Sequence, residues 1–390
     1  MVLLGAFLAL IGVSGCAQLD SEVGSSLVGD ELTGELSDTL LPVTFSGQVV
    51  IGDVYKTSPA SLPVGMQDGA TSDIVLRFQE FDRIGDTLLA VHSGTLWLYA
   101  IGFVDSEAVT DWTEWSAEVL RIDESYNPLE YRYEDELTVT PIDTIPLGTA
   151  AADDSIAIEL DSVTLHRWVE DTLAYGLRIR PIAPAGFLKR IVGAGSDPEK
   201  LPRLDLTVDF VAGEDTLLDS TVAVYNNLAT FLIDDQFAGS ELPRLYLAQG
   251  YARRMLFWAD FSLFDPAKVS LNRVDLVLHA DTSAEGVLGR LDSFTAFDLR
   301  GDWMTVGPDS AQFTSASNLA YPVPSDTSEV RVIITPLARV WTVQPDSNFG
   351  VGLRVLDEGE RISRACFFDI NADPEHRPMM HVIYTRFATP

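Results

Sequence analysis

Cysteine, histidine and positive charge are scarce in this chain. Its 390 residues include 2 cysteines, 5 histidines and 26 lysines and arginines, against 58 aspartates and glutamates, for a formal net charge of −32. Such an acidic surface repels phosphate backbones and anionic lipid headgroups, so nucleic acid is not expected as a partner. An acidic surface also attracts cations, but the need for solubility alone explains many compositions of this kind.

Local signatures of catalysis are missing as well. The sequence contains no Gly-x-Ser-x-Gly, His-Glu-x-x-His, Walker loop or dinucleotide fingerprint. His376 and His381 are close, but Pro378 between them rules out a helical pair of zinc ligands, and in a strand their odd separation puts them on opposite faces. Among 58 acidic residues, close carboxylate pairs are expected by chance, so no glycosidase dyad stands out. We therefore predict a protein that is not an enzyme, with no cofactor and no metal site.

The N-terminus has the pattern of a lipoprotein signal peptide. Residues 2–13 carry no charge and are mostly aliphatic, which suits a signal-peptide core and is too short to span a bilayer. Val13, Ser14 and Gly15 precede Cys16 and resemble a lipobox, so Cys16 is the predicted lipidation site. An incidental cysteine in a buried N-terminal strand is the alternative. Ala17 favours sorting to the outer membrane.

The next segment, residues 17–42, is acidic and rich in serine and glycine, and it shows no sustained apolar period. These properties predict a flexible tether that lifts a folded body off the membrane. If Cys16 carries lipid, Cys366 has no partner in the chain. Because Cys366 lies among apolar residues in "RACFFDI", we expect it to be a small core residue and not a catalytic thiol.

The rest of the chain consists of short apolar runs separated by turn residues. Runs such as "SIAIEL" and "LDLTVDF" alternate apolar and polar residues and are rich in β-branched side chains. Helical periods are scarce, and "SVTLHRWVED" is the best of them. Many short strands with few helices predict an all-β fold of antiparallel sandwiches.

A duplication divides this β-rich region. "SDPEKLPRLDLTV" (196–208) and "ADPEHRPMMHVIY" (372–384) share Asp-Pro-Glu-x-x-Pro, and Gly-Leu-Arg recurs at Gly176 and Gly352. The repeat predicts two domains of similar fold, residues 43–212 and 213–390, each with one short helix. The Asp-Pro turns are interpreted as architecture that starts the last strand of each copy, with alternate residues facing the core. A cation site at Asp197/Glu199 and Asp373/Glu375 is the alternative.

The order of these segments resembles the DNRLRE-type domain of secreted bacterial proteins. The resemblance includes "VLRF", "SGTLWLY", a Trp-containing segment, Thr-Leu-x-x-Trp, "YGLRI" and "LPRLDLTV", and it spans both copies. This family is related to the alginate-binding carbohydrate-binding module family 96. The resemblance implies tandem jelly-roll-like β-sandwiches on an extracellular or surface protein. Neither copy carries the string that names the family, and the second copy has Met379-Met380 where the family favours Arg-Leu.

Tryptophan supplies the candidate ligand-binding residues. Exposed aromatic faces stack on sugar rings, while neighbouring acidic or basic groups bind the hydroxyls. Trp112 and Trp115 lie in the polar segment "TDWTEWSAE", and Trp303 occupies a comparable place in the second copy. A tryptophan packed under a loop is the alternative for all three. Trp168 and Trp341 recur at matching positions of the two expected helices, so packing explains them better.

These observations predict a non-catalytic, lipid-anchored protein of the cell envelope. The leading hypothesis is that the tandem sandwiches bind extracellular polysaccharide, with avidity raised by their linkage. The alternative is a structural or adhesive surface protein whose sandwiches act as spacers or assembly units. We expect contact with the membrane through the lipid anchor only, as an outer-membrane lipoprotein that faces the surface or the periplasm.

Overall fold

A computed structural model describes most of the chain after the predicted signal peptide. The described residues are 34–54, 59–78, 88–103, 116–127, 131–146, 155–170, 175–182, 187–194, 197–212, 215–226, 228–235, 244–284, 287–288, 291–324, 329–359 and 361–387. No helix within these ranges is long and apolar enough to cross a membrane. Cys16 and most of the predicted tether lie outside them.

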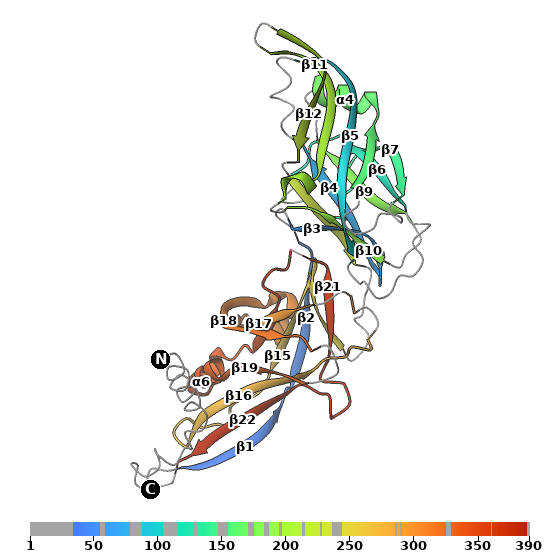
Figure 1. The fold of residues 1–390 in the computed structure, drawn as a ribbon. Helices are drawn as coiled ribbons and strands as arrows, with labels where there is room; N and C mark the ends of the chain where they lie inside the picture. Colours follow the sequence, from blue (N-terminus) through green and yellow to red (C-terminus); the bar gives the residue numbers. More distant parts are fainter. Residues whose placement is uncertain are drawn as a thin grey trace, which may run out of the picture.

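The described residues form two β-rich bodies joined end to end (Figure 1). The first body contains β3 (Ser61–Gln67), β4 (Ala70–Arg77), β5 (Leu88–Phe103), β6 (Ser116–Ile122), β7 (Val139–Pro146), β8 (Ser155–Leu160), α4 (Ser162–Glu170), β9 (Leu177–Ile182), β10 (Phe187–Val192), β11 (Arg203–Ala212), β12 (Asp215–Tyr225) and β13 (Leu228–Asp235). The second contains β1 (Glu35–Pro42), β2 (Phe45–Asp53), β14 (Arg244–Gln249), β15 (Tyr251–Trp258), β16 (Val269–His279), β17 (Ser293–Arg300), α5 (Trp303–Val306), β18 (Gln312–Pro322), β19 (Glu329–Ile333), α6 (Thr335–Val343), β20 (Val351–Arg354), β21 (Ser363–Phe368) and β22 (Met379–Arg386). The predicted all-β class is confirmed, and the second body carries the additional short helix α5.

Each body is a sandwich of two antiparallel layers. In the first body, β12-β11-β5-β8 forms one layer, and the other contains β10-β3-β4-β9-β6-β7 with β13 on the free side of β4. The layers share one apolar core because alternate residues of facing strands point inward, among them Leu206 from β11 and Ile74 from β4. The long strand β5 joins the layers by pairing with β11 and then with β10.

The second body repeats this strand order. One layer is β1-β22-β16-β19, and the other is β21-β14-β15-β20-β17-β18 with β2 on the free side of β15. Position by position, β22 takes the place of β11, β16 of β5, β15 of β4 and β20 of β9. The two bodies are therefore sandwiches of equivalent topology with separate core clusters, in agreement with the duplication in the sequence.

Two edge strands of each body come from the other half of the chain. β1 and β2 are the first strands in the chain, yet they pair with β22 and β15 of the second body. β12 and β13 begin the second repeat, yet they pair with β11 and β4 of the first body. Each repeat thus donates its first two strands to its neighbour, and the chain crosses the junction twice, after β2 and after β13.

This exchange corrects the predicted boundaries. The limits 43–212 and 213–390 mark sequence repeats, whereas each folded body combines strands from both sides of residue 212. The predicted tether is also too long, since residues 35–42 form β1 in register with β22. The sequence of β1 hides this because most of its side chains are exposed, as expected for an edge strand.

The Asp-Pro turns lead into the last strand of each repeat as predicted. Asp197 accepts a hydrogen bond from the Glu199 backbone N–H at 3.2 Å, and β11 follows. The inward side chains of β11 are fully buried, and so are those of β22 except Tyr384, which is 7% exposed. These core residues are Leu204, Leu206, Val208, Met380, Val382 and Tyr384.

A glycine of positive φ precedes the equivalent strands β9 and β20. A Cβ at Gly176 (φ 123°) would lie 2.3 Å from the Leu76 carbonyl oxygen, and one at Gly350 (φ 88°) would lie 2.3 Å from that of Phe257. No side chain fits there, so glycine is required at both positions. The structural counterpart of Gly176 is therefore Gly350 and not Gly352. The structural match therefore differs by two residues from the sequence match of the Gly-Leu-Arg segments. Because side chains alternate along a strand, a shift of two residues leaves the same face of the strand buried.

Each body carries its main helix against the end of the core. α4 begins after Asp161, whose carboxylate accepts a hydrogen bond from the Thr164 backbone N–H at 2.8 Å. Trp168 of α4 and Trp341 of α6 are buried in the first and second cores respectively. The prediction that these two tryptophans serve packing is confirmed.

Candidate functional site

A cleft opens to solvent where the two bodies meet. It has a volume of about 220 Å³ and is lined by the end of β2, the segment around Tyr133, the end of β13 and Tyr251 at the start of β15. Small-molecule sites occur preferentially at domain interfaces, and this cleft lies at such an interface but is smaller than the roughly 300–1,000 Å³ of pockets that enclose drug-sized ligands. The cleft combines two half-buried tyrosines with polar residues; its polar side chains are Asp53, Arg132, Glu134 and Asp234.

Local backbone geometry sets the position of Tyr251. It follows Gly250, and its ring packs beside Gly52 of β2, where an added Cβ would lie 3.9 Å from the ring. Gly52 has a φ of 86°, and β2 shifts its register against β15 at this point. The guanidinium of Arg253 lies 5.7 Å from the centre of the ring. Burial raises the pKa of Tyr251, and nearby carboxylates such as Asp235 reinforce the rise against the opposing charge of Arg253. The hydroxyl therefore stays protonated at neutral pH and able to donate a hydrogen bond.

Tyr133 reaches the cleft from the segment that joins β6 to β7. The segment lies over the outer face of the sheet, where Tyr131 packs with Val75 and Leu232. Arg178 of β9 holds it in two ways: Nη1 donates a hydrogen bond to the Tyr131 hydroxyl at 2.8 Å, and the guanidinium lies 5.2 Å from the Tyr133 ring centre. Burial, with the charge of Asp73, raises the pKa of Tyr133 to about 12.

A buried ion pair supports this segment from below. Asp73 of β4 has no exposed surface, and its Oδ2 accepts hydrogen bonds from Arg178 Nε at 2.6 Å and Arg180 Nε at 3.5 Å. Its Oδ1 accepts none from the described residues. Burial raises the pKa of Asp73 even though two guanidinium groups oppose the rise. The pair fixes Arg178, which in turn positions the tyrosines next to the cleft.

Ion pairs between the bodies hold the walls of the cleft together. Asp235 at the end of β13 has a side chain only 4% exposed and lies between Arg364 Nη1 at 2.6 Å and Arg253 Nη2 at 3.4 Å, both from the second body. Arg364 also donates to the carbonyl of Asp68 at 2.8 Å, at the tip of the β3–β4 hairpin. Arg132 donates to the carbonyl of Asp53 across the junction. These charge-assisted contacts join the two bodies beside the cleft.

Of the three predicted sugar-binding tryptophans, the structure describes only Trp303. Trp112 and Trp115 lie outside the described residues. Trp303 is only 3% exposed: it packs against Val49 and Leu256, and its Nε1 donates to the Phe349 carbonyl at 2.6 Å. The faces of its ring are therefore covered, and the alternative of a tryptophan packed under a loop describes Trp303.

Cys366 of β21 is buried, as expected for a core residue. Burial raises the pKa of its thiol to about 12, with a further contribution from the charge of Asp281. The thiol is therefore protonated at neutral pH, which suits packing better than nucleophilic chemistry.

Sequence reasoning missed the cleft tyrosines because the residues that line the cleft come from four distant segments. Comparison of the chain with protein-family models and with curated proteins found no match. The resemblance to DNRLRE-type domains thus stays a prediction that rests on the sequence segments themselves.

Proposed function

We propose that this protein is a non-catalytic, lipid-anchored component of the cell envelope that binds extracellular polysaccharide in the cleft between its two bodies. The observation that supports the proposal is the set of side chains in that cleft. Tyr133 and Tyr251 offer ring faces and protonated hydroxyls, and charged groups stand beside them. Rings that stack and charged groups that bind hydroxyls are what sugar recognition requires.

The charges of the cleft favour a neutral sugar over an acidic one. Three carboxylates, Asp53, Glu134 and Asp234, line it together with one guanidinium, Arg132. Carboxylates accept hydrogen bonds from sugar hydroxyls, but they repel uronates and sulfated sugars. The net charge of −32 acts in the same direction at long range.

Replacing Tyr251 with alanine is expected to weaken polysaccharide binding at least ten-fold. The change removes a ring face and a hydroxyl, each worth about 1 kcal/mol, and about 1.4 kcal/mol corresponds to a factor of ten. Affinity electrophoresis of the full chain through gels that contain neutral or acidic polysaccharides measures the effect. Glu134→Gln, an exposed change in the cleft, is expected to weaken binding by a smaller factor.

Tyr225→Ala is the matched control, because Tyr225 is a partly exposed tyrosine of β12 outside the cleft. It should bind as well as wild type, and circular dichroism should show all three variants folded. Two results would argue against the proposal: no retardation of wild type by any polysaccharide, or equal retardation of wild type, Tyr251→Ala and Glu134→Gln.

A second candidate function, assembly of a surface structure, is favoured by the exposed edge strand β1. β1 pairs with β22 on one side only among the described strands, and Leu36 and Leu40 on its outer face are 69% and 61% exposed. Unpaired edges with apolar side chains promote pairing between chains.

If the protein is an assembly unit, light scattering of the full chain is expected to show oligomers that grow with concentration. Leu36→Lys/Leu40→Lys should then shift the population to monomers, because charge on an edge strand opposes pairing. A wild-type chain that stays monomeric up to millimolar concentration would rule out this second function and leave polysaccharide binding untouched.

A further inference from the structure

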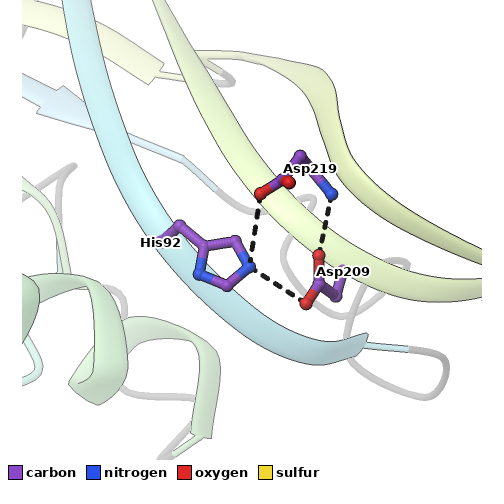
Figure 2. Close-up of side chains that lie close together, drawn as sticks. All are labelled: His92, Asp209 and Asp219. Atoms are coloured by element: carbon purple, nitrogen blue, oxygen red, sulfur yellow. Dashed lines mark hydrogen bonds and ion pairs between the residues drawn. The ribbon is translucent and has the colours of Figure 1, made fainter.

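Three side chains with metal-binding chemistry meet on the outer surface of the first body. His92 comes from β5, Asp209 from β11 and Asp219 from β12, which are neighbours in the order β12-β11-β5 (Figure 2). The His92 Nε2 atom lies 3.0 Å from Asp209 Oδ2 and 3.9 Å from Asp219 Oδ1. One ligand atom from each residue lies within 4.8 Å of the others.

Irregularities in both strand ladders bring these side chains together. The register of β11 against β5 shifts between Asp209 and Phe210, and its register against β12 shifts between Val208 and Phe210. Bulges of this kind redirect side chains and are frequent beside functional sites. Asp219 has a φ of 50°, and its backbone N–H donates to Asp209 Oδ1 at 2.8 Å, as Figure 2 shows.

The two carboxylate oxygens of Asp209 have different partners. Oδ2 of Asp209 remains directed at His92 while Oδ1 is occupied by the backbone.

We propose that His92, Asp209 and Asp219 form a binding site for a divalent transition-metal ion, with Zn²⁺ as the best fit. One imidazole and two carboxylates suit zinc and related ions, whereas calcium prefers six or more oxygen ligands. In a tetrahedral zinc site with bonds of about 2.0 to 2.2 Å, ligand atoms lie about 3.3 to 3.6 Å apart. The two distances to His92 Nε2, 3.0 and 3.9 Å, come near this range, so small rotations of exposed side chains complete the geometry.

Metal binding here would link three adjacent strands. The site has three protein ligands, and the fourth position is left to water or to a group of another molecule. The side chains of His92 and Asp219 are 43% and 83% exposed, so an ion reaches the site directly from solvent. β12 belongs to the second repeat, so the ion would also strengthen the attachment of an exchanged strand to the first body.

The competing explanation is a plain ion pair between His92 and Asp209, and the second body offers a matched control for it. His381 of β22 lies 3.4 Å from Asp38 of β1, also between an exchanged strand and its neighbour. No second carboxylate joins this pair to form a three-residue group among the described residues. Both bodies therefore have a histidine–aspartate pair at an exchanged strand or its neighbour. Among the described residues, only the pair in the first body has an additional aspartate, Asp219, beside it.

Titration of the full chain with ZnCl₂, followed by calorimetry, tests the proposal. Wild type is expected to bind one Zn²⁺ per chain more tightly than Ca²⁺ and to show a higher Tm with the metal present. His92→Gln, Asp209→Asn and Asp219→Asn should each bind Zn²⁺ at least ten-fold more weakly, whereas His381→Gln should bind like wild type. Co²⁺ in place of Zn²⁺ should give visible absorption bands that are lost in His92→Gln.

Three outcomes would overturn the proposal. These are that wild type fails to bind at millimolar Zn²⁺, that His92→Gln binds as tightly as wild type, or that His381→Gln loses as much affinity as the three site variants, as expected for adventitious binding spread over an acidic surface. The three ligand residues are partly or fully exposed, so circular dichroism without metal is expected to be unchanged and to separate lost ligation from lost folding. The result is independent of polysaccharide binding, because the site lies outside the cleft.

Discussion

Replacing Phe231 with alanine is expected to destabilise the first body by about 3 to 5 kcal/mol, although Phe231 belongs to the second sequence repeat. Its side chain is fully buried in the core of the first body, because β13 pairs with β4. Removing a buried phenylalanine costs about this much through lost burial and the cavity that remains. The measurement is hydrogen exchange along the full chain, where β4 and β9 should lose protection while β16 and β20 keep most of theirs.

Phe257→Ala is the control that isolates strand exchange. Phe257 is also fully buried and lies in the same repeat, but β15 is part of the second body. Its removal should weaken protection in β20 and β22 and spare β4. If Phe231→Ala instead loosens the second body, the two strands are not exchanged and each repeat folds as its own sandwich.

The sequence predicted the two sandwiches but not which strands complete them. Alternation in β11 and β22 and the repeated Asp-Pro turns were enough for fold class and duplication. The sequence contains no comparable signal of the strand exchange. β2 and β13 occupy equivalent edges of equivalent sheets, so either strand satisfies the same pairing rules.

The candidate sites were hidden for a related reason. His92 is far in the chain from Asp209 and Asp219, so no spacing rule for metal ligands brings the three together. They meet because β5 and β11 shift register at Asp209, and propensities do not reveal such shifts. In the same way, Tyr133 and Tyr251 meet only once the bodies are joined. Trp303 was selected because its place in the second copy is comparable to that of Trp112 and Trp115, but α5 turns its ring inward.

Replacing Arg178 with methionine is expected to lower the free energy of unfolding of the first body by about 3 to 5 kcal/mol. The change removes the nearer of the two guanidinium partners of Asp73, a carboxylate that has no contact with solvent, and leaves only Arg180 at 3.5 Å; Arg178 itself is only 3% exposed. Breaking one side of a buried ion pair has a cost of this order, since the remaining charge is left in an apolar setting. Urea unfolding followed by far-ultraviolet circular dichroism measures the change.

The double variant Asp73→Leu/Arg178→Met distinguishes a lost ion pair from lost packing. If the cost of Arg178→Met comes from the abandoned charge of Asp73, removing both charges should recover most of the stability. If the double variant is as unstable as the single one, shape and not charge is what Arg178 contributes. A loss below about 1 kcal/mol in Arg178→Met would contradict a buried role altogether.

Polysaccharide binding should respond differently from stability in that double variant. Methionine restores neither the hydrogen bond to Tyr131 nor the contact of the guanidinium with the Tyr133 ring. We therefore expect Asp73→Leu/Arg178→Met to fold well and still bind polysaccharide more weakly than wild type, because the segment that carries Tyr133 loses its anchor. Stability and binding that recover together would mean that core packing alone positions this segment, with Arg178 serving only to neutralise Asp73.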